Sequence, residues 1–308
     1  MKNNNIVAGI IVFNPELNRL AKCIENLLNE LEKVIIFDNS NVKITESFFD
    51  KFPNESVIYM DENGNKGISY GLNRVMEKGK EMGYDWVITM DQDSIIPVGL
   101  IDSYAKFIND EDVAIISPQV IDKRRKYMKI VKEPNIEYID EAITSASCTR
   151  IKHWEKVGKF DELLFIDLVD NEFCKRIIES GYKILRINEC ILDQEFGEIY
   201  PKQPIIQNFY IWLGELFNNE NIAKLSYKKS VNPLRVYYTN RNIIYVNKKM
   251  KNYGKVGYGN YNCKSYIGFL LCFSMPSILR GKHKFRILKA IIKGIIDGIK
   301  IKVEPWCI

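Results

Sequence analysis

Apolar segments that alternate with helical patterns constrain the fold of this 308-residue chain more than any other feature. Ile6–Phe13, Lys33–Phe37 and Trp86–Met90 are largely apolar, as expected for strands covered on both faces. Leu17–Leu31 has apolar residues at helical spacing, and Ile68–Met82 is also predicted as a helix. This alternation predicts an α/β fold with a mostly parallel sheet flanked by helices. Ser56–Met60 and Val113–Ser117 are predicted as further strands.

Polar clusters follow three of the predicted strands directly. They are Asn14, Asp38-Asn39-Ser40 and Asp91-Gln92-Asp93. In mostly parallel sheets the ligand crevice lies outside the carboxyl ends of the strands. We therefore expect the three clusters to converge on one crevice, and we interpret that crevice as a nucleotide site.

Asp91 and Asp93 are separated by one residue at a strand end, so their carboxylates can reach different ligands. One carboxylate can contact a ribose or a bound water while the other holds a divalent cation, which neutralises a diphosphate. A surface turn is the alternative interpretation of the same short pattern.

A second acidic group, Asp167, Asp170 and Glu172, lies among apolar residues in the segment 165–173. Apolar neighbours raise the pKa of a carboxyl group, which suits a general base. The same residues are typical of a helix N-terminus, where the helix dipole favours acids. Both interpretations can hold together.

The loop Glu62-Asn63-Gly64-Asn65-Lys66-Gly67 has two interpretations as well. Asn and Gly are typical of turns. A loop that opens a helix can also present backbone N–H groups to a nucleobase or a phosphate. The loop lacks the P-loop pattern, which excludes P-loop chemistry.

Charge divides the chain into two parts. Residues 220–308 contain 18 Lys and Arg against 3 acids, whereas residues 1–219 contain 26 against 36. Basic segments bind nucleic acids, anionic membranes or acidic partners. Lys284–Lys302 is predicted as a basic amphipathic helix, which either lies on a membrane, packs on the catalytic domain or joins two copies of the chain. Two domains are predicted, a catalytic one over 1–205 and a helical, aromatic-rich one over 206–308.

No membrane span or metal-binding cysteine motif is expected. Tyr266–Leu279 is the longest apolar stretch, but it is too short to cross a bilayer and contains Pro276. Residues 1–13 do not resemble a signal peptide. The seven scattered cysteines and two histidines indicate neither a zinc site nor a disulfide framework, and they fit a reducing compartment.

In order and spacing, the motifs together resemble the inverting GT-A fold glycosyltransferases of family 2, and most of all their rhamnosyltransferase branch. They are IVFNP (11–15), DNS (38–40), ENGNKGISYGLNR (62–74), MDQDS (90–94), SASCTRIKHWEKVGKFDELLFIDLVDNEFCKR (145–176) and YYTNRN (237–242). The resemblance implies transfer of a sugar, L-rhamnose from dTDP-L-rhamnose, to a hydroxyl group of a cell-surface polysaccharide or lipid-linked saccharide. The scattered thiols and the basic C-terminal part predict a cytoplasmic enzyme, peripheral on the inner face of the cell membrane.

The resemblance assigns roles to individual residues. Asp170 takes the place of the catalytic base, and Asp167 is the competing candidate. Asp93 is the principal metal ligand, and Asp91 faces the ribose or the metal. The remaining nucleotide-site residues implied are Phe13, Asn14, Asp38, Asn65, Gly67, Asn73 and Arg74.

Gln194 departs from the family pattern, which usually has a metal-binding His at that place. The amide oxygen of Gln is a hard, weak ligand, better suited to Mg²⁺ or a partly hydrated ion than to a softer metal. Asp193 or Glu195 could substitute for it. The expected cofactor is a divalent metal, Mg²⁺ or Mn²⁺, with Gln194 as a candidate third ligand.

Three other functions compete with rhamnosyl transfer. Transfer of galactose or galactofuranose from a UDP-sugar is the nearest, since pocket shape decides the sugar. A sugar nucleotidyltransferase should have a Gly-rich basic loop after its first strand, where this chain has Asn14-Pro15-Glu16. A nucleic-acid-binding protein would leave the acidic strand-end clusters without a purpose, so no nucleic acid is expected as a partner.

Overall fold

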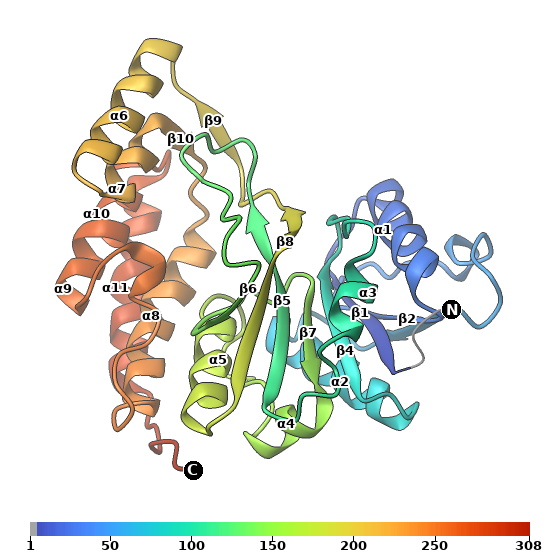
Figure 1. The fold of residues 1–308 in the computed structure, drawn as a ribbon. Coiled ribbons are helices and arrows are strands. Elements are labelled where there is room, and N and C mark those ends of the chain that lie inside the picture. Colours follow the sequence, from blue (N-terminus) through green and yellow to red (C-terminus); the bar gives the residue numbers. More distant parts are fainter. Residues whose placement is uncertain (1–4) are drawn as a thin grey trace.

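The structure, a computed structural model, describes residues 5–308. The predicted catalytic domain begins at residue 1, so its first four residues, and the part of the signal-peptide interpretation that concerns them, lie outside the described range. Eight strands form one mixed, mostly parallel sheet, as the apolar segments predict (Figure 1). In sheet order they are β3 (Val57–Asp61), β2 (Val34–Asp38), β1 (Ile6–Val12), β4 (Trp86–Asp91), β7 (Ser147–Arg150), β5 (Val113–Ile121), β8 (Lys183–Asp193) and β6 (Ile136–Ile139).

Helices cover both faces of the sheet. On one face, α1 (Leu17–Glu30) buries Leu20, Ile24 and Leu27 at helical spacing, and the Glu16 side chain caps its first turn. The short helix α3 (Leu100–Ala105) packs on the same face. The opposite face carries α2 (Ile68–Glu81), α4 (Ile151–Lys156) and α5 (Val169–Glu179). Both faces of the sheet are therefore buried, which explains why the central strands are apolar throughout.

Two strands run against the rest of the sheet. β7 pairs antiparallel with both β4 and β5, and β6 pairs antiparallel with β8. The parallel strands β1, β2 and β4 still end at the same edge, where Val12 pairs with Asp38 and Ile11 with Asp91. This common edge is where the polar clusters were expected to meet.

The C-terminal part is mainly helical and stands beside the β6 end of the sheet (Figure 1). The π-helical segment Leu270–Ser274 joins two of its helices. Its elements are β9 (Ile199–Pro201), α6 (Pro204–Leu216), α7 (Glu220–Ala223), β10 (Tyr227–Lys229), α8 (Pro233–Lys249), α9 (Tyr266–Phe269), α10 (Met275–Arg280) and α11 (Lys284–Lys300). Over residues 5–308, every helix is too short or too polar for a membrane span.

Helix α8 connects the C-terminal part to the sheet. Ile243, Val246 and Met250 belong to the same buried core as α2, α4 and α5. On its other side α8 packs along α11, where Gly294 allows the two backbones to come close. Since α8 is held on both sides, it can place polar side chains firmly against the sheet edge.

Candidate active site

The ends of β1, β2 and β4 are joined by hydrogen bonds. The backbone N–H of Phe13 donates to Gln92 Oε1 at 2.8 Å, and that of Asn14 donates to Ser40 Oγ at 2.6 Å. Asn14 adopts the left-handed conformation with φ of 47°, which Asn tolerates well. The three polar clusters thus lie together at one edge of the sheet, as expected from their strand-end positions.

Asp38 is fully buried and engaged by the protein itself. Its carboxylate accepts from the backbone N–H groups of Ser40 (2.7 Å) and Ile44 (3.0 Å) and from the Tyr59 hydroxyl (2.8 Å). Burial would raise the pKa of Asp38, but these hydrogen bonds outweigh it and hold the pKa below its usual range. Asp38 therefore braces the loop that follows β2, and its role at the nucleotide stays a prediction.

The loop before α2 lies against both the β2 cluster and the segment before α5. Asn39 Nδ2 donates to the carbonyl oxygen of Gly67 at 2.9 Å, and the Gly67 N–H donates to Asn65 Oδ1 at 2.9 Å. Gly67 has φ of 95°, and a Cβ there would lie 2.8 Å from the carbonyl oxygen of Phe165. Only glycine fits this position, where the loop before α2 touches the segment that leads to Asp167 and Asp170.

Asn73 and Arg74 make contacts within the protein. Asn73 is buried; its Oδ1 accepts from Trp154 Nε1 (3.1 Å) and the Phe160 N–H (2.9 Å), and its Nδ2 donates to the Phe160 carbonyl (3.0 Å). Arg74 lies between two acids, Glu77 at 2.7 Å and Glu62 at 3.3 Å. The structure therefore gives both residues structural contacts, and their roles at the nucleotide stay predictions.

Asp91 lies at the end of β4 and contacts Gln194, 103 residues away in the chain, through a hydrogen bond from Gln194 Nε2. Burial, and then the charge of Asp93, raises the pKa of Asp91 to about 6. Asp93 is half exposed, 3.9 Å from Arg19 Nη1. Asp193 and Glu195, the suggested substitutes for Gln194, contact Lys123 and Arg124 instead.

The oxygens around Asp91 fit a hard divalent cation. Gln194 Oε1 is buried and has no hydrogen-bond partner among the described residues, so an acceptor oxygen is available beside the Asp91 carboxylate. Nowhere in residues 5–308 do three His, Cys, Asp or Glu side chains gather as a metal site. Asp91, Asp93 and Gln194 would therefore hold the ion with help from water or a ligand, as Mg²⁺ and Mn²⁺ allow.

Asp167 is held in place by side chains of α8. Its backbone is left-handed, with φ of 67°, and so is that of Leu168, with φ of 65°. Arg235 and Thr239 donate to the Asp167 carboxylate, and Asn242 Nδ2 donates to its carbonyl oxygen at 2.9 Å. Two consecutive left-handed residues are costly, and these α8 contacts hold them in place.

Asp170 lies in the first turn of α5, at a hollow lined by Thr144, Ser147, Phe160 and Phe173 among others. Burial, and then the charge of Asp91, raises the pKa of Asp170 to about 7, although hydrogen bonds from Thr144 oppose the shift. A carboxyl group with this pKa exchanges a proton readily at neutral pH. Glu172, by contrast, is fully buried against Arg176 (2.7 Å) and Lys249 (2.8 Å), which makes it structural.

Four residues at the site had no role in the sequence-based prediction: Thr144, Arg235, Thr239 and Asn242. The last three occupy one side of α8, at helical spacing from 235 to 242. The sequence signal for Thr239 and Asn242 was the polar run TNRN (239–242), which follows two tyrosines. Polar residues that interrupt an apolar helix face often contact another part of the protein.

Comparisons of sequence agree with the motifs. The sequence model of "Glycosyl transferase family 2" matches residues 8–167. The chain is 30% identical over 212 residues to the dTDP-rhamnosyl transferase RfbF of Shigella flexneri, covering 64% of this chain and 71% of that protein.

Solved structures have the same fold. The mannosyltransferase PcManGT from Pyrobaculum calidifontis, in complex with GDP-Man and Mn²⁺, superposes with a TM-score of 0.54 at 12% identity, covering 93% of this chain and 73% of that one. GalNAc-T7 with UDP, GalNAc and Mn²⁺ gives 0.52 at 12% identity, covering 88% and 56%. The expected GT-A architecture, a large mostly parallel sheet with flanking helices, is confirmed.

Proposed function

Because the chain belongs to glycosyl transferase family 2, we propose that it transfers L-rhamnose from dTDP-L-rhamnose to a saccharide hydroxyl group, with inversion. The similarity to a dTDP-rhamnosyl transferase supports the donor. One observation supports the reaction: Asp170, whose pKa is about 7, lies close enough to Asp91 for the Asp91 charge to raise that pKa. A general base and a polar nucleotide pocket are what a single displacement requires.

In the proposed mechanism, Asp170 accepts the proton of the acceptor hydroxyl group. The hydroxyl oxygen attacks the anomeric carbon as the bond to the nucleoside diphosphate breaks on the opposite face, so the configuration inverts. Thr144 holds the Asp170 carboxylate, and the Asp91 charge keeps that carboxylate basic. General base assistance contributes about 10²–10⁴-fold to the rate.

Asp93, Asp91 and Gln194 are proposed to hold the divalent cation. When bound, Mg²⁺ or Mn²⁺ would neutralise the diphosphate and so lower the energy of its departure. Asp91 and Gln194 also orient each other through their hydrogen bond. On the nucleotide side, the loop 65–67 and the Phe13–Asn14 segment are proposed to surround the base and the ribose, on a frame set by Asp38.

A binding screen tests the donor. Thermal unfolding is followed with dTDP-rhamnose, UDP-galactose and UDP-galactofuranose, each with Mg²⁺ and with Mn²⁺. Ligands that bind the folded state raise Tm by mass action. The proposal expects dTDP-rhamnose to give the largest rise. A larger rise with a UDP-sugar would assign a galactosyl or galactofuranosyl donor instead, and no rise with any nucleotide would contradict the enzymatic function.

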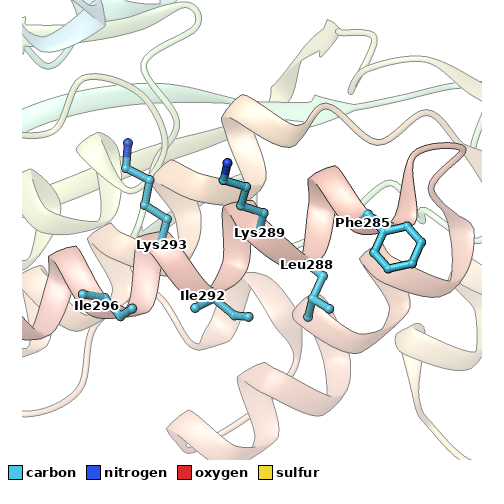
Figure 2. A pocket seen from close by; sticks show the side chains of 6 residues that line it. All are labelled: Phe285, Leu288, Lys289, Ile292, Lys293 and Ile296. Carbon is cyan, nitrogen blue, oxygen red and sulfur yellow. The ribbon is translucent and has the colours of Figure 1, made fainter.

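We also propose that the predicted C-terminal region, 206–308, brings the enzyme to an anionic membrane that carries a lipid-linked acceptor. Helix α11 has two apolar sides. Ile287 and Ile291 are buried, while Phe285, Ile292 and Ile299 are 88%, 49% and 61% exposed. Figure 2 shows Leu288, Ile292 and Ile296 on one side of α11, with Lys289 and Lys293 extending beside them. An apolar stripe flanked by lysines is typical of a helix that lies in the headgroup plane.

Vesicle flotation tests this attachment. The full chain should bind vesicles that contain phosphatidylglycerol, and salt should weaken the binding. Ile292→Ser with Ile296→Ser should reduce it, whereas Ile205→Ser, at an 84% exposed site on α6, should not. If the double variant instead dissociates a dimer while vesicle binding is unchanged, the stripe joins two copies of the chain.

A further inference from the structure

Basic side chains bind phosphate groups, and Arg74 is the one basic residue among the implied nucleotide-site residues. The structure holds Arg74 between Glu62 and Glu77. On the side of Asp91 and Asp167, the positive charges come instead from the C-terminal part of the chain. They are carried by Lys229, at the end of β10, and Arg235, in the first turns of α8.

Hydrogen bonds around the buried Asp122 side chain hold the loop that carries Gln194. The Phe196 N–H donates to Asp122 Oδ2 at 3.1 Å, and Arg125 Nη2 donates to the Phe196 carbonyl at 2.8 Å. Arg124 Nη2 donates to the carbonyl oxygen of Gly197 at 3.0 Å. These hydrogen bonds hold the loop from Gln194 to Gly197 in place. Gln194, at the start of the loop, contacts Asp91.

The Lys229 side chain lies against this loop, next to Gly197. A Cβ at Gly197 would be 3.9 Å from Lys229 Cε. The pairing of Lys229 with Ile199 in the β9–β10 ribbon fixes the start of the side chain. Its direction is thus set by the fold, toward the Gln194 loop.

Within residues 5–308, the Lys229 ammonium group has neither a hydrogen bond nor an ion pair. Solvent reaches the residue, yet packing around the ammonium group, and then the charges of Arg125 and Arg235, lower its pKa to about 8. Lys224 adds to this effect, and Asp167 opposes it. Arg125 and Arg235 have carboxylate partners in Asp122 and Asp167, whereas the Lys229 ammonium group has none among residues 5–308, so a bound anion would supply its missing partner.

Arg235 is the second arm of the same site. Its guanidinium group holds Asp167 but is 57% exposed, so its free N–H groups can donate to a ligand as well. Lys229 thus lies against the loop that follows Gln194, and Arg235 lies at Asp167.

We propose that Lys229 and Arg235 form a diphosphate-binding site at the mouth of the crevice. This inference rests on the proposed function and assigns these residues to a substrate group. The diphosphate belongs either to the nucleotide donor or to a lipid-linked acceptor, since both offer the same charged oxygens. Paired cations on rigid elements suit such a group because each can donate to a different phosphate.

Calorimetric titration of Lys229→Met tests the site, with Lys228→Met as the matched control. Lys228 is the preceding residue of β10, so its side chain points to the other side of the ribbon. The ligands are inorganic pyrophosphate, dTDP and farnesyl diphosphate. Loss of a charge-assisted hydrogen bond predicts about 10- to 100-fold weaker pyrophosphate binding by Lys229→Met. Lys228→Met should bind like the wild type.

The other two ligands identify the source of the diphosphate. Weaker dTDP binding with unchanged farnesyl diphosphate binding assigns the site to the donor, and the reverse assigns it to the acceptor. Unchanged pyrophosphate affinity in Lys229→Met, or no pyrophosphate binding by the wild type, would overturn the inference. Failure of the proposed function has a different signature, in which the wild type binds pyrophosphate but no nucleotide.

Discussion

At the residue scale, the surroundings of Asp170 raise its pKa into the range that suits a general base. Burial and the nearby charges of Asp91 and Asp167 raise its pKa, while Thr144 lowers it. The result is a carboxyl group that is half protonated near neutral pH rather than fully ionised. The sequence indicated this, since Asp170 lies among apolar residues, but the contribution of Asp91, 79 positions earlier, depends on the fold.

This environment predicts a pH profile. If Asp170 must be ionised to act as the base, kcat/KM rises with pH along a limb centred on about 7. Asp167→Asn removes a neighbouring negative charge, so the limb should move to lower pH while activity persists. Steady-state rates from pH 5 to pH 9 measure both. Complete inactivity of Asp167→Asn would make Asp167 the base instead.

The same shift predicts how stability depends on pH. The folded-state pKa of Asp170 lies above its unfolded value, so its contribution to stability is present below about pH 4 and is lost as pH rises through about 7. Asp170→Asn removes that loss. We expect its Tm to exceed that of the wild type by a few degrees at pH 8 and to match it at pH 4. A lower Tm at pH 8 would contradict the raised pKa.

Asn73 illustrates a contact that local sequence does not reveal. It lies in a motif that the family resemblance assigns to the nucleotide site. Its side-chain amide nevertheless forms hydrogen bonds with Trp154 and Phe160, more than 80 positions later. Asn73→Ala should lower the free energy of unfolding by about 1–3 kcal/mol for each buried group left unpaired. Urea unfolding measures this, with the half-exposed Arg74→Ala as the control, which should change little. Weakened nucleotide binding at unchanged stability would support the role implied by the resemblance.

At the element scale, most strands and helices up to residue 121 were predicted from apolar runs or from apolar residues at helical spacing, but the short helix α3 was not. β7 was not, since Ser147–Arg150 is short and largely polar, and its place in the sheet comes from pairing on both sides. The amphipathic helix over 284–302 was predicted, and the structure divides its apolar residues. One side packs on α8 and the other stays exposed.

Because α11 packs closely on α8, we expect a Gly-to-Ala change in α11 to destabilise the protein, the opposite of the usual effect. Replacing a helical Gly by Ala ordinarily stabilises a helix by about 1 kcal/mol. At Gly294, a Cβ would lie 2.5 Å from the Tyr237 carbonyl oxygen on α8, so Gly294→Ala should destabilise the protein by about 1–3 kcal/mol. Chemical unfolding checks this, with Ile296→Ala on the exposed side as the control. A stabilised Gly294→Ala would show that the helices are not in close contact.

At the scale of the whole molecule, ion pairs join the acidic N-terminal part of the chain to its basic C-terminal part. Acids of the sheet region meet bases of the C-terminal part, as Asp167 meets Arg235 and Asp161 meets Lys249. The sequence revealed the imbalance, but not its targets. Pairs that lie 68 or 88 positions apart are set by tertiary packing, which leaves no local pattern.

The central claim is that Asp170 drives displacement at a nucleotide-sugar site. The most direct measurement is the rate of dTDP release from dTDP-rhamnose with Mg²⁺, with water as the acceptor, together with the affinity for dTDP in the same samples. For Asp170→Asn, the account predicts release about 10²–10⁴-fold slower than in the wild type, with the affinity for dTDP unchanged. An undiminished rate, or an equal loss of rate and affinity, would contradict it.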